Sequence, residues 1–342
     1  MRDIKYLLAY TGPLSAIIAL YFQGILSYST FFYAFLMVPI LELIIDNQQD
    51  DDEYNETEKQ MRLKNKFFDL ILYLNLPLTF GVLFWGFSEI SSQSLEMYEI
   101  IGLTVSLGIV LSSNGINVAH ELGHRKTTFE KTLSKLLLMP SLYMHFYLEH
   151  NFGHHKNVAT NEDPATAKKN QSLYSFWITS VVGQYFNAWR IQLKLLKQNG
   201  SPFLSLKNDM LFYVFFQSIY LILIYVFFGT YTLLFAILVA IISFLLLETI
   251  NYIEHYGLLR KKVNGRYEKV QTIHSWNSNH FVGRIVLYEL TRHSDHHYRS
   301  SKKYQILENK NESPQLPFGY PTSMLISMIP PLWYKLMNPR LV

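Results

Sequence analysis

Residues 149–155 read Glu-His-Asn-Phe-Gly-His-His and carry three imidazole side chains within six positions. On an α-helix, His150 and His154 lie one turn apart on the same face. His155 is rotated by about 100° from His154, so it could reach a second centre or complete the same one. This arrangement is typical of a metal-binding motif. The predicted fold is the one that brings this segment together with similar segments elsewhere in the chain.

Two further clusters and one single histidine repeat the pattern. Residues 120–124 read His-Glu-Leu-Gly-His, residues 293–297 read His-Ser-Asp-His-His, and residues 251–258 read Asn-Tyr-Ile-Glu-His-Tyr-Gly-Leu. Imidazole is a ligand of zinc, copper, nickel and iron, and a tetrahedral ion takes only three or four ligands. We therefore predict a dinuclear site with four or five histidines for each metal. Nine of the chain's 12 histidines are its candidate ligands: His120, His124, His150, His154, His155, His255, His293, His296 and His297.

The composition indicates a membrane protein. The 342-residue chain is 49% hydrophobic and 16% charged, whereas about 25% of an ordinary soluble domain is charged. None of the 30 lysines and arginines occurs within residues 6–58, 67–124 or 208–259. Each gap has room for two membrane helices of about 20 residues and a turn. One Lys or Arg in mid-membrane costs roughly 2.5–3.5 kcal/mol, so these gaps favour membrane helices over the alternative, the core helices of a soluble protein.

Six segments within the gaps are predicted to cross the membrane: residues 6–22, 25–45, 67–87, 100–119, 211–228 and 233–250. The turns between paired segments contain no Lys or Arg, so all basic residues lie on one side, which the positive-inside rule identifies as the cytoplasm. Residues 46–66, 120–208 and 251–342 are then cytoplasmic segments. The first predicted helix lacks a signal-peptide cleavage site and is expected to be a retained anchor.

The predicted fold class follows from this topology. We expect an all-α polytopic membrane protein with six transmembrane helices and a cytosol-facing helical cap that holds the histidine-rich dinuclear site. Residues 1–342 form one domain, located in the inner (cytoplasmic) membrane with the metal site facing the cytoplasm. Residues 172–197 are amphipathic and are predicted to lie along the membrane interface. The acidic run at 50–53 is expected to belong to a solvated loop, and residues 324–336 are too broken by prolines to cross.

Five carboxylates accompany the histidines in sequence: Glu121, Glu149, Asp163, Glu254 and Asp295. Two divalent ions with neutral imidazoles introduce four positive charges, so we expect carboxylates close by. Metal-binding histidines commonly donate their second N–H to such groups. Sequence neighbours on a helix point about 100° apart, so each carboxylate should serve a histidine of another motif. Whether one of them, Glu254 foremost, binds metal directly stays open.

Two other interpretations are weaker. Residues 120–124 match the HExxH signature of zinc peptidases, in which the glutamate is a general base. Such an enzyme needs one further ligand rather than six or seven further histidines. A metal transporter would need polar groups within the membrane segments, where they are sparse. The absence of cysteine excludes disulfides, iron–sulfur clusters, thiolate-bound haem and a fused rubredoxin-type domain.

Taken together, the motifs resemble the integral-membrane alkane 1-monooxygenases, within the wider superfamily of histidine-box desaturases and hydroxylases. The specific part is the Asn-Tyr-Ile-Glu-His-Tyr-Gly-Leu box at 251–258, because general desaturases share only a looser three-box pattern. The similarity also covers residues 120–124, residues 149–164, the Ser-Trp-Asn-Ser-Asn run at 275–279 and residues 292–297.

This resemblance implies a non-haem di-iron enzyme that uses O₂ to hydroxylate the terminal carbon of medium-to-long-chain alkanes, giving 1-alkanols and water. It implies the nine histidines above as iron ligands, with Glu254 and Asp163 as catalytic residues beside them. The alkane is expected to come from the bilayer, and the electrons from rubredoxin, itself reduced by a flavin-dependent rubredoxin reductase. A nucleic acid is not an expected partner. The alternatives are related membrane di-iron enzymes: a fatty-acyl desaturase, or a hydroxylase of aryl-methyl groups or terpenoids.

Overall fold

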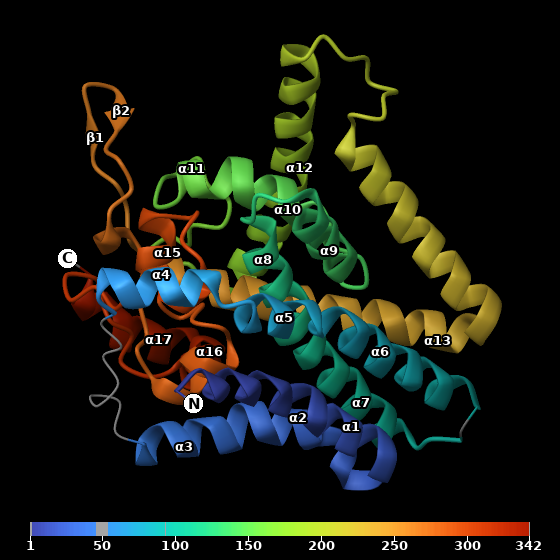
Figure 1. The fold of residues 1–342 in the computed structure, drawn as a ribbon. Coiled ribbons are helices and arrows are strands. Elements are labelled where there is room, and N and C mark those ends of the chain that lie inside the picture. Colours follow the sequence, from blue (N-terminus) through green and yellow to red (C-terminus); the bar gives the residue numbers. More distant parts are fainter. Residues whose placement is uncertain (1, 46–53, 93, 342) are drawn as a thin grey trace.

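The computed structural model describes residues 2–45, 54–92 and 94–341, and over these ranges the protein is almost entirely helical (Figure 1). The acidic run at 50–53 lies outside the described residues. The helical content agrees with the predicted all-α class. The apolar helices pack beside a cap of shorter helices that carries two of the four histidine motifs, and the other two lie at the ends of apolar helices.

Within the described residues, five helices are long and apolar enough to cross a membrane: Asp3–Phe22, Gly24–Ile44, Phe67–Ser92, Met97–Gly123 and Asp209–His255. The sequence predicted six. The difference lies in the last helix, α13 (Asp209–His255), which continues through a kink at Gly229 with φ 81° and ψ −179°. Glycine adopts this left-handed φ without a steric cost. The arms before and after the kink are each long enough to cross. Counting α13 as one helix gives five spans, and counting its two arms separately gives the predicted six.

Several apolar helices are assembled from shorter pieces, because α-, 3₁₀- and π-helical turns follow one another without a break in the chain. The pieces are η1 (Arg2–Tyr10), α1 (Thr11–Phe22), η2 (Gly24–Tyr28), α2 (Ser29–Phe32), η3 (Tyr33–Met37), α3 (Val38–Ile44), α5 (Phe67–Tyr73), α6 (Asn75–Ser92), α7 (Met97–Val110), η4 (Leu111–Ile116) and α8 (Asn117–Gly123). Of these, η3 and η4 are π-helical. Turns of this type occur frequently at functional sites.

The cap consists of the remaining elements. They are α4 (Glu56–Lys64), α9 (Thr128–Leu138), α10 (Phe146–Glu149), η5 (His150–His154), α11 (His155–Asn157), α12 (Leu173–Gln198), β1 (Lys262–Val263), β2 (Arg266–Tyr267), η6 (Thr272–His274), α14 (Phe281–Val286), α15 (His293–Tyr298), η7 (Tyr304–Ile306), α16 (Tyr320–Ser327), α17 (Pro330–Met337) and η8 (Asn338–Arg340). Strands β1 and β2 pair antiparallel, with Lys262 opposite Tyr267. Residues 324–336, predicted to be too broken to cross, lie in the short helices α16 and α17.

A chain of buried amides joins the apolar helices beneath the cap. Asn114 Nδ2 donates to the Ala9 carbonyl at 3.1 Å and to Asn75 Oδ1 at 2.9 Å. Asn75 Nδ2 in turn lies 3.0 Å from the hydroxyl of Tyr288 in the cap. Polar side chains of this kind link membrane helices, because few alternative partners exist in hydrocarbon. The network fixes η1, α6 and η4 relative to the segment that leads into α15.

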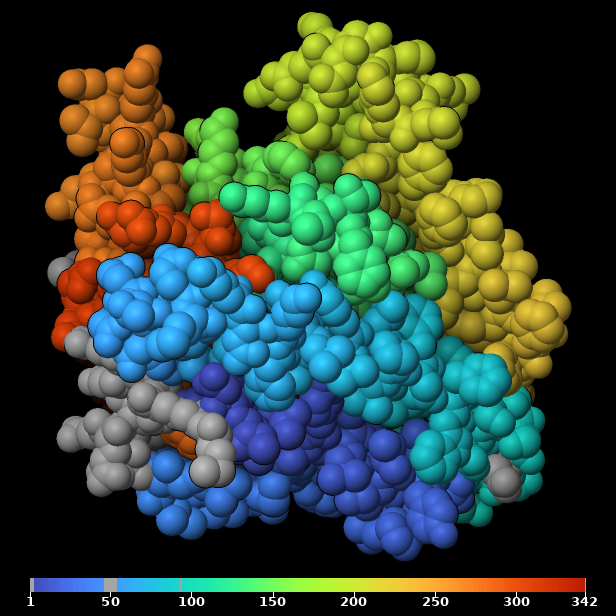
Figure 2. Space-filling view, viewed as in Figure 1, coloured from blue at the N-terminus to red at the C-terminus, as the bar shows by residue number. Residues whose placement is uncertain are grey.

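Helix α12 is a single 26-residue helix, as its amphipathic pattern predicted. One side packs on α10 and α13, and the other exposes apolar side chains such as Ile178 and Phe186. In Figure 1, α12 runs across the direction of the second arm of α13 rather than along it. Figure 2 shows that α12 and the first arm of α13 project from the rest of the molecule (yellow-green to yellow, upper right). This placement suits a helix that lies along an interface.

Candidate metal centre

The four histidine motifs come from separate elements and meet at one place. They lie at the end of α8, in η5 and the start of α11, at the end of α13, and in α15. The nine predicted histidines form two groups, and within each group the potential ligand atoms lie within 4.8 Å of one another. The five-histidine group contains His120, His124, His150, His155 and His296. The four-histidine group contains His154, His255, His293 and His297.

The Nε2 atoms converge closely within each group. In the five-histidine group, Nε2 of His150 lies 3.1 Å from that of His124 and 3.0 Å from that of His155. In the four-histidine group, Nε2 of His255 lies 3.1 Å from that of His293. Two nitrogens bound to one ion at about 2.1 Å, with an angle between 90° and 110°, are about 3.0 to 3.4 Å apart. The spacing and the donor type therefore fit a transition-metal ion in each group.

A π-helical turn decides which histidine enters which group. In η5 the backbone N–H of His155 donates to the carbonyl of His150, five residues earlier. Residues five apart consequently share a face, so His150 and His155 lie together while His154 points to the other group. The rings of His150 and His154 do lie side by side, with 5.2 Å between centroids, but they belong to different groups. His296 and His297 in α15 also divide between the two groups.

A glycine in the same motif allows close packing. A Cβ atom at Gly153 would lie 2.7 Å from Oε1 of Glu149 and 2.9 Å from Nδ2 of Asn187 on α12. Those two groups are hydrogen-bonded to each other at 3.0 Å. Because Gly153 has no side chain, α12 can pack closely against η5, and its Asn187 can hydrogen-bond Glu149 of the histidine motif.

Asp163 supports one histidine directly. Its Oδ2 atom lies 3.0 Å from Nδ1 of His154 and accepts the Thr166 hydroxyl at 2.6 Å. Burial alone would lower the pKa of His154, but the Asp163 carboxylate, assisted by that of Glu149, holds this pKa above its usual value. The contact fixes the orientation of the ring, so Nε2 remains directed at the four-histidine group. Asp163 thus serves the histidine cluster nearest to it in sequence, nine residues away, and not one of another motif.

Glu254 occupies a different position. It is buried, its Oε2 atom lies 3.2 Å from Nε2 of His293, and its Oε1 atom accepts the Tyr320 hydroxyl at 2.6 Å. The carboxylate thus reaches the same edge of His293 that faces the four-histidine group. Sequence reasoning missed Tyr320, because 66 residues separate it from Glu254 and no metal-ligand pattern includes it.

The other three carboxylates have partners away from the imidazoles. Glu121 pairs with Arg125 at 2.8 Å, and Asp295 pairs with Lys302 at 2.6 Å. Glu149 accepts from Asn187, as described above. Because Glu121 is held by the arginine, it is not placed as a general base among the histidines. This disfavours the zinc-peptidase interpretation of residues 120–124.

Among the metal-site histidines outside the apolar helices, all except His154 have a lowered pKa, which favours the neutral form that binds metal. Burial, reinforced by neighbouring histidines, lowers the pKa of His124, His150 and His155 well below its usual value. Burial likewise lowers the pKa of His296 to about 3. Neutral imidazole is the ligating form. Of the nine, only His124 and His155 are half-buried rather than buried, so the five-histidine group is the one nearer the surface.

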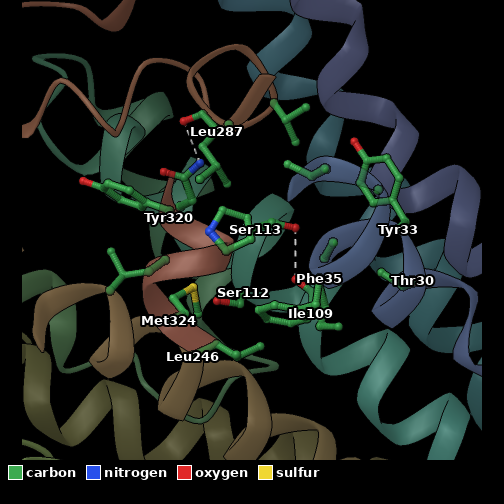
Figure 3. A pocket seen from close by; sticks show the side chains of 18 residues that line it. Thr30, Tyr33, Phe35, Ile109, Ser112, Ser113, Leu246, Leu287, Tyr320 and Met324 are labelled. Atoms are coloured by element: carbon green, nitrogen blue, oxygen red, sulfur yellow. Dashed lines mark hydrogen bonds between the residues drawn. The ribbon is translucent and has the colours of Figure 1, made fainter. Parts of the chain in front are cut away.

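Two cavities lead to these groups. The first, of about 90 Å³, is lined largely by apolar side chains, with Tyr33 on one side and Tyr320 on the other (Figure 3). The second, of about 20 Å³, is lined by residues that include His120, His293 and Glu254. Both cavities are lined by Ser112, Asn117 and Ile250, so they are adjacent. Together they place an apolar space next to the metal-binding side chains.

The remaining three histidines lie outside both groups, as predicted. His274 Nδ1 accepts the Gln271 N–H at 2.9 Å, and His280 Nδ1 lies 2.8 Å from the Ser278 hydroxyl. Both contacts are local and structural. His145 lies elsewhere, between the rings of Tyr143 and Tyr185.

Comparison with known proteins identifies relatives along most of the chain. The sequence model of the fatty acid desaturase family matches residues 98–323, a range that contains all four histidine motifs. An alkane 1-monooxygenase 1 from Alcanivorax borkumensis is 34% identical over 341 residues, covering 98% of this chain and 84% of the relative. Alkane 1-monooxygenases from Pseudomonas putida and Ectopseudomonas oleovorans are 36% and 38% identical, covering 90% and 82% of this chain and 76% and 70% of the relatives.

Proposed function

Because this chain belongs to the alkane 1-monooxygenase family, within the fatty acid desaturase superfamily, we propose that it hydroxylates the terminal carbon of medium-to-long-chain alkanes to 1-alkanols. It is a multi-pass membrane enzyme. The observation that carries the proposal is the apolar cavity that adjoins the histidine-lined one. An alkane offers no polar group for recognition, so a tight apolar space must orient it by shape.

The metal centre is proposed to hold two iron ions. His120, His124, His150, His155 and His296 would bind one ion, and His154, His255, His293 and His297 the other. When bound, the iron pair supplies the activation of O₂, of which one atom enters the C–H bond and the other leaves as water. Nine imidazole donors, with neighbouring Nε2 atoms about 3 Å apart within each group, support this assignment.

The protein's own residues perform the remaining tasks. Asp163 holds the His154 ring in place through Nδ1. Glu254 lines the cavity beside His293, and the Tyr320 hydroxyl keeps its Oε1 atom fixed. Because Tyr320 also lines the apolar cavity, the Tyr320–Glu254 pair lies where the alkane terminus would meet the metal centre. Burial of this pair keeps bulk water away from the reacting carbon.

Electrons must come from a partner, since the chain has no cysteine and no electron-carrying motif. We propose rubredoxin as this partner, reduced by its flavin-dependent reductase. Rubredoxins are typically acidic, and a face that carries the basic residues of the chain favours such a protein electrostatically. The half-buried His124 and His155 make the five-histidine group the accessible one. The same charge asymmetry supports an inner-membrane location with the metal site facing the cytoplasm.

Product analysis tests the proposal. Purified protein in lipid nanodiscs would be supplied with iron, rubredoxin, reductase, NADH and a mixture of short to long alkanes, together with an alkylbenzene and a fatty-acyl substrate. We expect 1-alkanols by gas chromatography and mass spectrometry, and no alcohol when rubredoxin is omitted. An unsaturated acyl chain or a benzylic alcohol as the main product would contradict the assignment. So would a purified protein that contains stoichiometric zinc instead of iron.

A further inference from the structure

A second apolar space lies on the surface of the molecule, away from the cavity in Figure 3. This groove has a volume of about 310 Å³ and is formed by α12, by the turn around Leu142 and by Phe244 of α13. From α12 it is lined by the exposed side chains of Val182, Tyr185 and Phe186. None of these residues belongs to the metal centre. The groove follows the helix that is expected to lie along the membrane interface.

One polar group lies in the wall of this groove. His145 is only 6% exposed, and its Nε2 atom has no hydrogen-bond partner within the part of the chain that the structure describes. Buried polar atoms are nearly always paired, so this atom needs an explanation. The ring lies between Tyr143, with 4.3 Å between ring centroids, and Tyr185, with 5.2 Å. Burial lowers the pKa of His145 to about 3, so the ring is neutral and can pair with a hydroxyl.

Two aromatic rings in contact with each other link the groove to the metal centre. Tyr143 lines the groove and stacks on Phe244 with 5.1 Å between centroids. Phe146 follows, 6.4 Å from Tyr143, and stacks on His150 at 4.7 Å. Phe146 also lines the small cavity at the histidines. A connection between the metal centre and the groove therefore requires both rings to turn, which breaks the 2.9 Å hydrogen bond that the Tyr143 hydroxyl donates to Oε1 of Glu248.

We propose that this groove binds the 1-alkanol product as it leaves the enzyme, with the hydroxyl on His145 and the chain along α12. The proposal rests on the proposed function, because it assumes that the product is a primary alcohol. An alkane dissolves in the hydrocarbon interior, whereas an alkanol is amphipathic and prefers the interface, where one end is apolar and the other wet. The groove has apolar walls and one group, His145, that can form a hydrogen bond with a hydroxyl, so it matches this product. The alkane has no hydroxyl and gains no hydrogen bond there. Tyr185, which is 38% exposed and packs on His145, is the ring that turns to admit the hydroxyl.

Photo-crosslinking tests the site without turnover. A straight-chain primary alcohol that carries a diazirine in its chain would be added to the iron-loaded protein in nanodiscs, with no rubredoxin and no NADH. We expect labelling of Val182 and Phe186, displaced by unlabelled 1-alkanol but not by the n-alkane of equal length. Absence of labelling in the groove would overturn the proposal. Displacement by phosphatidylglycerol or a fatty acid as effective as that by alkanol would also overturn it, because the groove would then be a lipid site.

Matched variants on α12 and at the polar wall complete the test. His145→Phe keeps a ring but removes the nitrogen, and loss of one neutral hydrogen bond should weaken alkanol labelling about fivefold. Val182→Trp should block the groove and lower kcat with an unchanged KM for alkane. Ile178→Trp, one turn earlier on α12 and 69% exposed but outside the groove, is the control and should match wild type in both assays. Equal iron content would verify folding of each variant.

The two proposals fail in different ways. A protein that converts alkane to alkanol but is not labelled in the groove refutes the groove alone. Wild-type labelling and kcat in both His145→Phe and Val182→Trp would refute it as well. A labelled protein that yields no alkanol from alkane in the complete system refutes the proposed function.

Discussion

Replacement of Asp163 by asparagine tests how the four-histidine group is held. The carboxylate uses both oxygens as acceptors: Oδ2 faces His154 Nδ1 and the Thr166 hydroxyl, and Oδ1 accepts the Ala165 N–H at 3.2 Å. An asparagine side chain has one oxygen and one NH₂ group. Whichever way it is turned, the NH₂ group faces a donor, so either the His154 contact or the turn at Ala165 is lost.

The expected effect is specific to one metal. Loss of the group that orients a metal-binding histidine typically lowers metal affinity about 10- to 100-fold, or about 1.4 to 2.7 kcal/mol. His154 belongs only to the four-histidine group, so the five-histidine group should keep its affinity. In a chelator titration followed by elemental analysis, Asp163→Asn should pass through a plateau near one iron per chain, at chelator concentrations where wild type retains about two.

The neighbouring residue provides the control. Glu162 is exposed, and Glu162→Gln removes a charge of the same sign next to Asp163 without changing the contact with His154. This variant should follow the wild-type titration. If Asp163→Asn keeps both irons as firmly as wild type, or loses the two ions together, the role assigned to Asp163 is refuted.

Four other outcomes are expected. His255→Ala should abolish alkanol formation while the protein still inserts into the membrane, and full activity in this variant would remove His255 from the ligand set. Tyr320→Phe leaves Oε1 of Glu254 without its partner, so kcat should fall about tenfold, with iron content unchanged by elemental analysis. Asn114→Leu removes two buried hydrogen bonds and should lower stability in a thermal-unfolding assay by about 1 to 2 kcal/mol. Gly153→Ala brings a Cβ against Glu149 and Asn187 and should reduce iron occupancy more than an alanine at Gly81, where the space is open.

Much of the architecture could be predicted because the membrane imposes a simple rule. Gaps free of Lys and Arg located the apolar helices within a few residues, for example 100–119 against Met97–Gly123. The break at Gly229 falls where the sequence predicts a turn between two crossing segments. The backbone is non-helical at this residue and separates two helical arms, each long enough to cross the membrane.

Two groups of four or five histidines were predicted, but the membership of each group could not be. Composition and apolar periodicity are the same whether a short segment is α- or π-helical, so nothing in residues 149–155 distinguishes neighbours four apart from neighbours five apart. The Tyr320–Glu254 contact could not be predicted from the sequence either, for a different reason. It joins α16 to the end of α13, and the packing of two elements distant in sequence leaves no local pattern.

The division of His154 from His155, and of His296 from His297, has a mechanical consequence. In each pair, one peptide unit joins a residue of one group to a residue of the other, and consecutive Cα atoms are about 3.8 Å apart by covalent geometry alone. Two such links, on different helices, would limit the separation of ions bound in the two groups. A backbone movement at one group would therefore be passed to the other through covalent bonds.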